Sequence, residues 1–480
     1  MHGTITLPLL FSDNMVLQQN SKVNFWGKSS PNEKIVITVD WQNNSFTTKA
    51  DNLGSWKIEI TTDKASFKEH TISIKGNNEI ILKNVLLGEV WFSSGQSNME
   101  LVMRKVKESD KEISESIYPN IRLFNVKKKK ADEPQSEISE GSKWLPCSPE
   151  SVKEFSAMSY YFARKMQKEL SVPIGIITAN WGGTGAECWT PSENMKENPV
   201  LKNIYKRWGQ WEIDKVKDSI AFVETKNQNP KAEEPRSIYM TKRQHRRPSV
   251  LYNAMIAPLM PYTIKGVIWY QGTSNREWAN EYLEQMKALI YGWRKNWKIG
   301  DFPFYFLQLT AYKYSDSNLA AIIRENQLKT LEVPYTAMCP TMDIGDLNEL
   351  HVNYKLPYGV RLANIALANS YKKKIDFCGP LFQQYKVKGG KVEITFLFNK
   401  KLHYNGDKLN DIYIAGNDKK FVKATAFIDN NKLIVFSTEV KEPVAVRYAW
   451  NNTGEANLFN YSNLPASPFR TDVWENIIIE

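Results

Sequence analysis

The sequence predicts an α/β fold in which a parallel-sheet domain is flanked by an N-terminal and a C-terminal antiparallel β domain. Nearly continuous apolar runs in the middle of the chain are typical of buried parallel strands, and apolar residues at helical spacing lie between them. At both ends of the chain, short β-rich segments alternate with turn residues. The expected domains are therefore residues 1–87, 88–374 and 375–480.

The composition is that of a folded protein without membrane spans. The chain has 480 residues, of which 42% are hydrophobic, and no segment approaches 18 consecutive apolar residues. The formal net charge is +11, but the lysines are spread along the chain and the dense run at 127–130 is followed by acidic residues. A solvated loop therefore explains this run better than a nucleic-acid site.

The four cysteines predict neither a metal site nor a disulfide framework. They show no C-x-x-C pair and no metal-ligand spacing, although one bridge in an oxidising compartment is compatible with their number. The N-terminus lacks a charged region followed by an apolar stretch and a small-residue cleavage site. The protein is therefore expected to be cytoplasmic, or to derive from a precursor whose signal was removed.

Both flanking domains are expected to consist of short antiparallel strands. In the N-terminal domain the strands are expected at residues 22–26, 34–39, 55–60 and 71–75. In the C-terminal domain they are expected at residues 391–398, 411–415, 432–437 and 445–450. Turn residues separate these segments, which is typical of small antiparallel sheets.

The central domain alternates strands and helices. A helix at 155–170 precedes the apolar run 174–177, and a helix at 283–297 lies between strands at 266–270 and 304–309. Residues 190–250 interrupt this order and are expected to form a helical insertion near the site, either a lid or packing. Sites in parallel sheets lie beyond the carboxyl ends of the strands. Such positions are those of Ser97, residues 180–185 and residues 271–275.

Ser97 follows a predicted buried strand. The apolar run at 90–92 stops in small and polar residues, Gly95 allows a tight turn, and a helix is expected after Ser97 because residues 100–107 contain good helix formers. The first N–H groups of that helix would face negative charge that develops near Ser97. The alternative is that Ser97 and its neighbours are ordinary loop and N-cap residues.

A serine nucleophile needs a base, and the chain has five histidines. Four of them lack the setting of a base. His2 is terminal, His70 lies at the entrance of a strand, His245 lies among cations and His403 precedes a turn. His351 instead follows an apolar run and a loop that contains Asp343, Asp346 and Glu349. A nearby carboxylate orients an imidazole and stabilises the imidazolium that forms when serine loses its proton. The alternative is a surface histidine in an acidic loop.

Four segments carry a resemblance to a known family. They read Gly-Gln-Ser-Asn-Met at 95–99, Trp-Gly-Gly-Thr at 181–184, Trp-Tyr-Gln-Gly-Thr-Ser-Asn at 269–275 and Asp-Ile-Gly-Asp-Leu-Asn-Glu-Leu-His at 343–351. In this order they resemble the sialate O-acetylesterases, which belong to the SGNH hydrolase superfamily. Further likeness at 172–175, 250–259 and 463–472 extends the resemblance over nearly the whole chain. It implies an SGNH-type hydrolase domain between the two β domains.

The resemblance implies a serine esterase that removes acetyl groups from carbohydrate, first of all from O-acetylated sialic acid. Ser97 Oγ would attack the ester, His351 would take the proton and return it to the leaving hydroxyl, and water would hydrolyse the acetyl-enzyme. No metal or organic cofactor is expected. The implied location is the periplasm or the secreted fraction. The expected oxyanion donors are the Ser97 N–H, the N–H of Gly183 or Gly182, and the side-chain amide of Gln271 or Asn275.

Two positions depart from the family pattern. Thr273 stands where a glutamate is usual, and Asn348 stands three residues before His351, where SGNH hydrolases commonly carry an aspartate. An amide cannot supply that charge. We therefore expect a Ser-His dyad whose imidazole is oriented by Glu349 or by a backbone carbonyl, with the more distant Asp346 as a further alternative.

Two other functions fit the sequence. An esterase for acetylated xylan or another glycan would share the same segments. A noncatalytic carbohydrate-binding protein would agree with the flanking β domains and with the two departures. Four tryptophans could either stack on sugar or lie in the core: Trp181, Trp189, Trp269 and Trp278.

Overall fold

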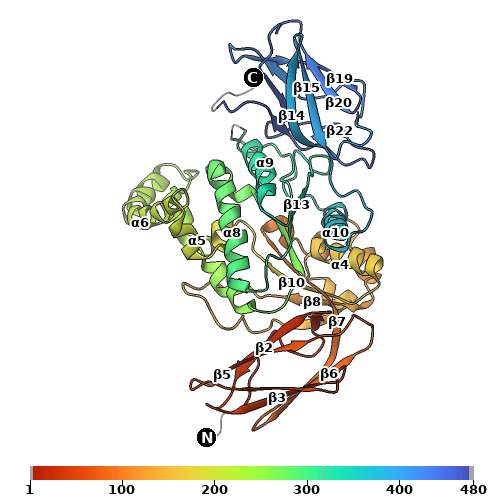
Figure 1. The fold of residues 1–480 in the computed structure, drawn as a ribbon. Coiled ribbons are helices and arrows are strands. Elements are labelled where there is room, and N and C mark those ends of the chain that lie inside the picture. The colour runs from red at the N-terminus through yellow and green to blue at the C-terminus, as the bar shows by residue number, and fades with distance from the viewer. Residues whose placement is uncertain (1–3, 317, 475–480) are drawn as a thin grey trace. The chain divides into compact units, whose positions relative to one another are not determined.

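The computed structural model describes residues 4–316 and 318–474 (Figure 1). The chain forms two compact units. The first comprises Met1–Ile268 and Glu284–Pro303, and the second comprises Trp269–Leu283 and Phe304–Glu480. The division falls within β11 (Gly266–Tyr270), which coincides with the strand expected at 266–270.

The N-terminal part of the first unit is an antiparallel β region. β2 (Lys22–Lys28) pairs with β5 (Ser55–Thr61), and β3 (Lys34–Val39) pairs with both β4 (Ser45–Lys49) and β6 (His70–Lys75). The four expected strands are confirmed. β4 and the short β1 (Val16–Gln18) were not predicted; β4 is polar and has no fully buried residue, so its sequence carries little strand signal.

One long strand connects this β region to the α/β region of the same unit. β7 (Glu79–Gly95) pairs antiparallel with β6 along its first half and parallel with β10 (Ile174–Asn180) from Glu89 to Gly95. All of its residues from 85 to 95 are buried. The strand therefore runs without interruption through residue 87, where the sequence predicted a domain boundary.

The α/β region contains the expected parallel strands, but its sheet is mixed because an antiparallel strand is added at one edge. β7 and β8 (Tyr118–Asn125) both pair parallel with β10, whereas β9 (Trp144–Cys147) pairs antiparallel with β8. β9 ends the strand order of this sheet. A four-residue edge strand that contains a proline shows no usable periodicity, which is why the sequence did not predict it.

Helices cover both faces of this sheet. Trp91 and Phe92 are consecutive in β7, so their side chains point to opposite faces. Trp91 packs against Phe162 of α4 (Ala157–Leu170), whereas Phe92 packs against Trp293 and Trp297 of α8 (Tyr282–Trp297). All five rings are fully buried. The two long helices expected from the sequence thus form the core on either side of β7.

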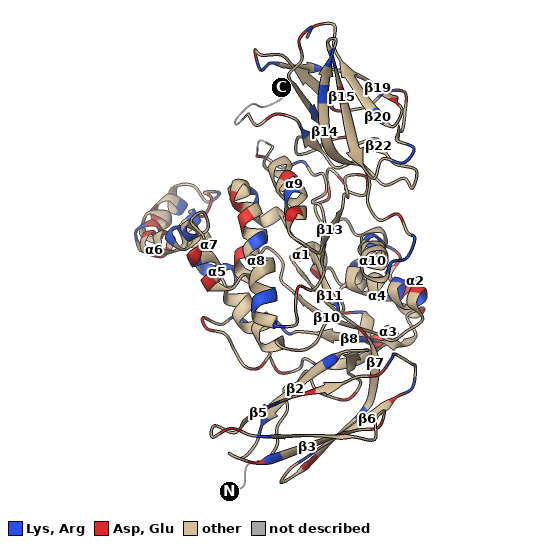
Figure 2. Ribbon diagram, viewed as in Figure 1, with Lys and Arg blue, Asp and Glu red and all other residues tan. Residues whose placement is uncertain are grey.

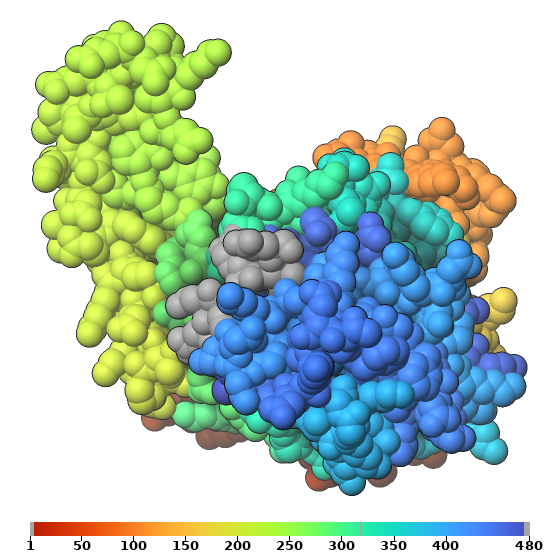
Figure 3. All heavy atoms as spheres, turned by 90° about the horizontal axis from the view of Figure 1, so that it is seen from above, coloured from red at the N-terminus to blue at the C-terminus, as the bar shows by residue number. Residues whose placement is uncertain are grey.

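The insertion at 190–250 is helical, as expected. It contains α5 (Ser192–Glu197), α6 (Lys202–Gln228) and α7 (Arg236–Lys242). The lime-green atoms of α6 and α7 form a lobe of their own (Figure 3), and charged residues of both signs occur along these helices (Figure 2). Apart from short 3₁₀ turns, the other short α-helices described in the first unit are α1 (Ser97–Glu100), α2 (Ser109–Ser114) and α3 (Pro149–Val152).

The second unit begins with a parallel strand pair, β12 (Phe304–Leu307) and β13 (Thr336–Cys339), and two helices, α9 (Leu319–Lys329) and α10 (Leu356–Tyr371). Two four-stranded antiparallel sheets follow and share one core (Figure 1). The first contains β14 (Leu381–Lys388), β15 (Lys391–Leu397), β20 (Lys432–Phe436) and β19 (Thr425–Asp429). The second contains β18 (Phe421–Lys423), β17 (Ile412–Ala415), β21 (Ala445–Tyr448) and β23 (Phe469–Arg470). The four strands expected near 391, 411, 432 and 445 are confirmed.

Within the described residues, no helix is long and apolar enough to cross a membrane. The four cysteines are buried and carry free thiols. Burial raises the pKa of Cys147 and Cys339 to about 12, so these thiols are protonated and unreactive at neutral pH.

Candidate active site

Ser97 is half-buried at the carboxyl end of β7, as the sequence predicted. Gly95 has a φ of 153°, which favours glycine, and the next two residues turn the chain into α1. A helix begins at Ser97, as expected, but α1 ends at Glu100 and only a 3₁₀ turn at Met103–Lys105 follows it. Val102 instead forms a β-bridge with Ser156, and this tertiary pairing outweighs the helix propensity of the segment.

Gly182 packs directly against Ser97. A methyl group at Gly182 would lie 3.2 Å from Cβ of Ser97. The backbone N–H of Gly182 donates to Oε2 of Glu100 over 2.5 Å, and the N–H of Trp181 donates to the carbonyl of Gly95 over 3.2 Å. Because Glu100 occupies the N–H of Gly182, the neighbouring N–H of Gly183 is the better candidate for an oxyanion donor.

Charged and aromatic side chains surround this loop within the first unit. Lys128 forms an ion pair with Glu100, and its Nζ lies 5.3 Å from the ring centroid of Trp181. The indole of Trp181 stacks on the imidazole of His245, with centroids 4.8 Å apart and ring planes 5° from parallel. Burial and the cations around it lower the pKa of His245.

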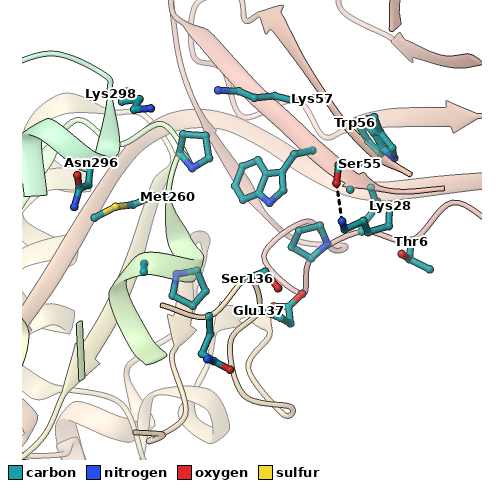
Figure 4. A pocket seen from close by; sticks show the side chains of 18 residues that line it. Thr6, Lys28, Ser55, Trp56, Lys57, Ser136, Glu137, Met260, Asn296 and Lys298 are labelled. Atoms are coloured by element: carbon teal, nitrogen blue, oxygen red, sulfur yellow. Dashed lines mark hydrogen bonds between the residues drawn. The ribbon is translucent and has the colours of Figure 1, made fainter. Parts of the chain in front are cut away.

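A cavity of about 310 Å³ lies beside the same loop. Glu100, Lys128 and Asn180 are among the residues that line it. Oδ1 of Asn180 is buried and accepts no hydrogen bond. A larger cavity of about 630 Å³ opens elsewhere in the first unit (Figure 4). Trp56, Glu137 and Met260 are among the residues that line it, and none of the predicted site residues does.

Gln271 and Asn275 form one hydrogen-bonded group in the second unit. Nε2 of Gln271 donates to Oδ1 of Asn275 over 2.6 Å, and Oε1 of Gln271 accepts from the hydroxyl of Tyr282 over 2.9 Å. Both amides are buried. Because Nε2 of Gln271 already donates to Asn275, Nδ2 of Asn275 is the better candidate for an oxyanion donor.

An ion pair steadies the loop that contains Thr273. Nε of Arg276 donates to Oδ2 of Asp316 over 2.9 Å, and the Arg276 guanidinium lies 3.5 Å from the ring centroid of Tyr314. Thr273 offers its carbonyl to Arg276 over 3.3 Å. An ion pair therefore stabilises this loop, although Thr273 itself is uncharged.

His351 lies at the surface of the second unit and is only partly covered, in a loop whose carboxylates bind backbone N–H groups. Oδ1 of Asp346 accepts from the N–H groups of Asn348 and Glu349 over 2.7 and 3.2 Å. Oε1 of Glu349 accepts from the backbone N–H of His351 over 2.8 Å. Asp343 anchors the start of the loop by a two-point ion pair with Arg361. The carboxylate of Glu349 thus fixes the main chain of His351.

Lys355 is a buried cation close to this histidine. It is 1% exposed, and burial lowers its pKa to about 7, an effect that Glu349 partly offsets. The pKa of His351 is lowered in turn, first by its own partial burial and then by Lys355, while Glu349 raises it. The imidazole of His351 is therefore mainly neutral at pH 7, as a proton acceptor must be.

Comparison with known proteins places the chain in a family. A family model described as carbohydrate esterase, sialic acid-specific acetylesterase matches residues 237–368. The crystal structure of a carbohydrate acetylesterase from Xanthomonas citri is 33% identical with a TM-score of 0.84, and the match covers 98% of this chain and 100% of that one. The chain belongs to the sialate O-acetylesterase family.

Sialate O-acetylesterases from Mus musculus and Homo sapiens are 27% and 25% identical to this family member. The alignments cover 96% and 95% of this chain and 93% and 91% of the two relatives. Membership makes the chain a carboxylic ester hydrolase. The alternative of a noncatalytic binding protein is therefore not supported.

The described residues of this acetylesterase divide the predicted site between the two units. Ser97, Gly182 and Gly183 belong to the first unit, and the second unit holds the remaining candidates: Gln271, Asn275, Glu349 and His351. Of the four tryptophans, Trp189 and Trp269 are buried in the core and are not sugar platforms, whereas Trp181 and Trp278 are half-buried.

Sequence reasoning missed three residues of the site. By sequence alone Glu100 is a helix former and Lys128 is part of a solvated loop, and no pattern marks Lys355. Glu100 and Lys128 act through tertiary contacts with Gly182 and Trp181, and Lys355 acts through the effect of its charge on His351. The only available signal was position, since Glu100 lies three residues after Ser97 and Lys355 four residues after His351.

Proposed function

We propose that the protein is an SGNH-type serine esterase that removes acetyl groups from O-acetylated sialic acid, with Ser97 as nucleophile and His351 as general base. The observation that carries the proposal is the setting of Ser97. It lies at the carboxyl end of β7, with Gly182 packed against it and Glu100 holding the backbone of Gly182. The names of the relatives supply the substrate class.

In the proposed reaction, Ser97 Oγ forms a bond to the acetyl carbonyl carbon while its proton moves to His351. The tetrahedral intermediate collapses as the bond to the sugar oxygen breaks, and His351 returns the proton to that oxygen. Water then attacks the acetyl-enzyme with His351 again as base, which releases acetate and restores Ser97. Ser97 and His351 are therefore back in their initial protonation states at the end of a full cycle.

The base needs a neutral imidazole held in one place. The lowered pKa of His351 keeps it unprotonated at neutral pH. Glu349 holds the backbone N–H of His351 and adds a negative charge nearby, which favours the imidazolium of the transition state. Glu349 is thus proposed as a positioning residue that acts through the main chain of His351.

The oxyanion is proposed to bind to three donors: the backbone N–H of Ser97, the N–H of Gly183 and Nδ2 of Asn275. Gly183 has a φ of 72°, a conformation that L side chains rarely adopt. Gln271 is proposed to orient Asn275 through the 2.6 Å hydrogen bond between their amides. One such donor typically contributes about 3 kcal/mol to lowering the barrier.

Acetate release tests the proposal. Wild-type protein should release acetate from O-acetylated sialic acid, and Ser97→Ala and His351→Ala should each remove nearly all of this activity. Ser114→Ala, on the exposed end of α2, and His403→Ala, in β16 (His403–Tyr404), are matched controls that should retain it. Full activity in Ser97→Ala would refute the nucleophile.

The second candidate substrate is acetylated xylan or another glycan. It is favoured by the description of the Xanthomonas citri relative as a carbohydrate acetylesterase, which specifies no sialic acid. A higher kcat/KM for acetylated xylan than for O-acetylated sialic acid would establish this substrate instead. We further propose a periplasmic or secreted location, which cell fractionation with antibody detection would test.

A further inference from the structure

Trp181 fixes a turn of the insertion beside the nucleophile loop. It directly precedes Gly182, whose Cα packs against Ser97, and its indole stacks on His245. His245 and Arg246 belong to one short 3₁₀ turn, Gln244–Arg246. The stack therefore brings the next residue, Arg246, to the loop that is proposed to bind the oxyanion.

Arg246 lies alongside Gly183. A methyl group at Gly183 would be 2.5 Å from Nη2 of Arg246, 3.4 Å from Cζ and 3.7 Å from Nε, so the Nε–Nη2 edge of the guanidinium faces this glycine. Nη1 is engaged elsewhere, because it donates to the hydroxyl of Tyr239 over 3.1 Å. Nε is buried and has no hydrogen-bond partner. A side chain at position 183 would collide with Nη2 of Arg246, so only glycine allows the guanidinium to approach this loop so closely.

The charge of Arg246 is not neutralised locally. Each of three neighbouring cations pairs with a carboxylate: Lys128 with Glu100, Arg243 with Glu234 and Arg247 with Asp132. Across residues 4–316 and 318–474, by contrast, no carboxylate forms an ion pair with Arg246. A partly buried guanidinium without a counter-ion is a strong binding group for an anion.

We propose that Arg246 forms a subsite for the carboxylate of an acidic sugar, one residue along the loop from the glycine that packs on Ser97. The proposal rests on the function proposed above, in which Ser97 deacetylates such a sugar. The Nε–Nη2 edge offers two parallel N–H donors, which match the two oxygens of a carboxylate. The subsite would select acidic over neutral acetylated sugars.

The neighbours of Arg246 suit this role. Burial and nearby cations, Arg246 and Lys128 first among them, lower the pKa of His245, so its imidazole is neutral at pH 7 and serves as a stacking partner. The Tyr239 ring lies 5.2 Å from the Arg246 guanidinium and fixes its plane. The carboxylate would therefore meet a preoriented cation, at little cost in side-chain entropy.

Substrate pairs that differ in charge test the subsite. The Arg246→Met variant should lose about 10- to 100-fold in kcat/KM for O-acetylated sialic acid, mainly through KM, which is the range expected for one charge-assisted contact. It should keep wild-type kcat/KM for the neutral ester p-nitrophenyl acetate and for an O-acetylated neutral hexosamine. Arg246→Lys should recover part of the loss. Arg243→Met is the matched control, because it removes a cation of the same insertion that already has a carboxylate partner.

Binding of the deacetylated product separates the subsite from the reaction. Calorimetry should show that free sialic acid binds wild type and Ser97→Ala with equal affinity. Adding Arg246→Met should weaken this binding at least tenfold. Equal losses for acidic and neutral esters, or unchanged binding of sialic acid in Arg246→Met, would overturn the subsite. If Ser97→Ala kept full esterase activity while sialic acid still bound through Arg246, the proposed function would be refuted and the subsite would stand.

Discussion

Glu100 and Gly182 are joined by a hydrogen bond of 2.5 Å from the backbone N–H of Gly182 to Oε2 of Glu100. They lie 82 positions apart in sequence, Glu100 at the end of α1 after β7 and Gly182 in the turn after β10. A carboxylate that accepts a backbone N–H forms a stronger hydrogen bond than a neutral acceptor. Glu100 therefore determines how closely the glycine loop lies against Ser97.

Loss of the Glu100 carboxylate should lower turnover. We expect Glu100→Ala to reduce kcat about 10- to 100-fold, because the loop is no longer fixed and Gly183 is displaced as a donor. Glu100→Gln keeps an acceptor oxygen and should recover most of kcat. Lys128→Met is the control for the ion pair, because it removes the cation that pairs with Glu100 and leaves the Glu100 carboxylate in place. Wild-type kcat in a folded Glu100→Ala variant, with its melting temperature measured in parallel, would contradict this role.

The two side-chain amides should differ in their contributions. Asn275→Ala removes the proposed oxyanion donor, and we expect a roughly 10²- to 10³-fold loss of kcat with little change in KM. Gln271→Met removes only the group that orients Asn275, so its loss of kcat should be smaller. Asn280→Ala, exposed in the same segment, is the control. The assignment would be reversed if Gln271→Met were more damaging than Asn275→Ala while both variants remained folded.

Glu349→Ala should cause a moderate loss. The carboxylate binds the backbone N–H of His351, so its removal loosens the loop and withdraws a charge near the imidazolium. We expect the loss of kcat to be well short of the ~10⁴-fold effect of replacing the triad aspartate in serine proteases, where the carboxylate binds the imidazole itself. Glu349→Gln should retain loop order. A loss near ~10⁴-fold in steady-state kcat would show that Glu349 acts on the imidazole directly.

The sequence predicted most strands and both long central helices because their apolar periodicity is strong. It failed where tertiary contacts decide. The segment after Ser97 has helix formers, yet Val102 pairs with Ser156. The candidate nucleophile, the candidate base and the glycine loop were recognised from short motifs, whereas Glu100 and Arg246 act through contacts with residues distant in sequence, which no local pattern encodes.

Lys355 should control the pH dependence of the reaction. His351 must be neutral to accept the proton of Ser97, so kcat/KM should fall as the pH drops through the pKa of His351. Partial burial and the Lys355 cation both lower this pKa, and the acid limb should therefore lie below about pH 6.5, the ordinary value for histidine. Lys355 has a pKa of about 7, so it is mainly charged throughout that limb.

Lys355→Met removes the cation and keeps the length of the buried side chain. The pKa of His351 should then rise, and the acid limb of kcat/KM for p-nitrophenyl acetate should move to higher pH. Lys355→Arg keeps the charge and should leave the limb in place. The folded-state pKa of Lys355 lies below its unfolded value of 10.5, so burial of this group costs stability below pH 10.5, and most below about pH 7. Lys355→Met should therefore also raise the melting temperature at neutral pH. An acid limb that stays in place in Lys355→Met would show that burial alone sets the pKa of His351.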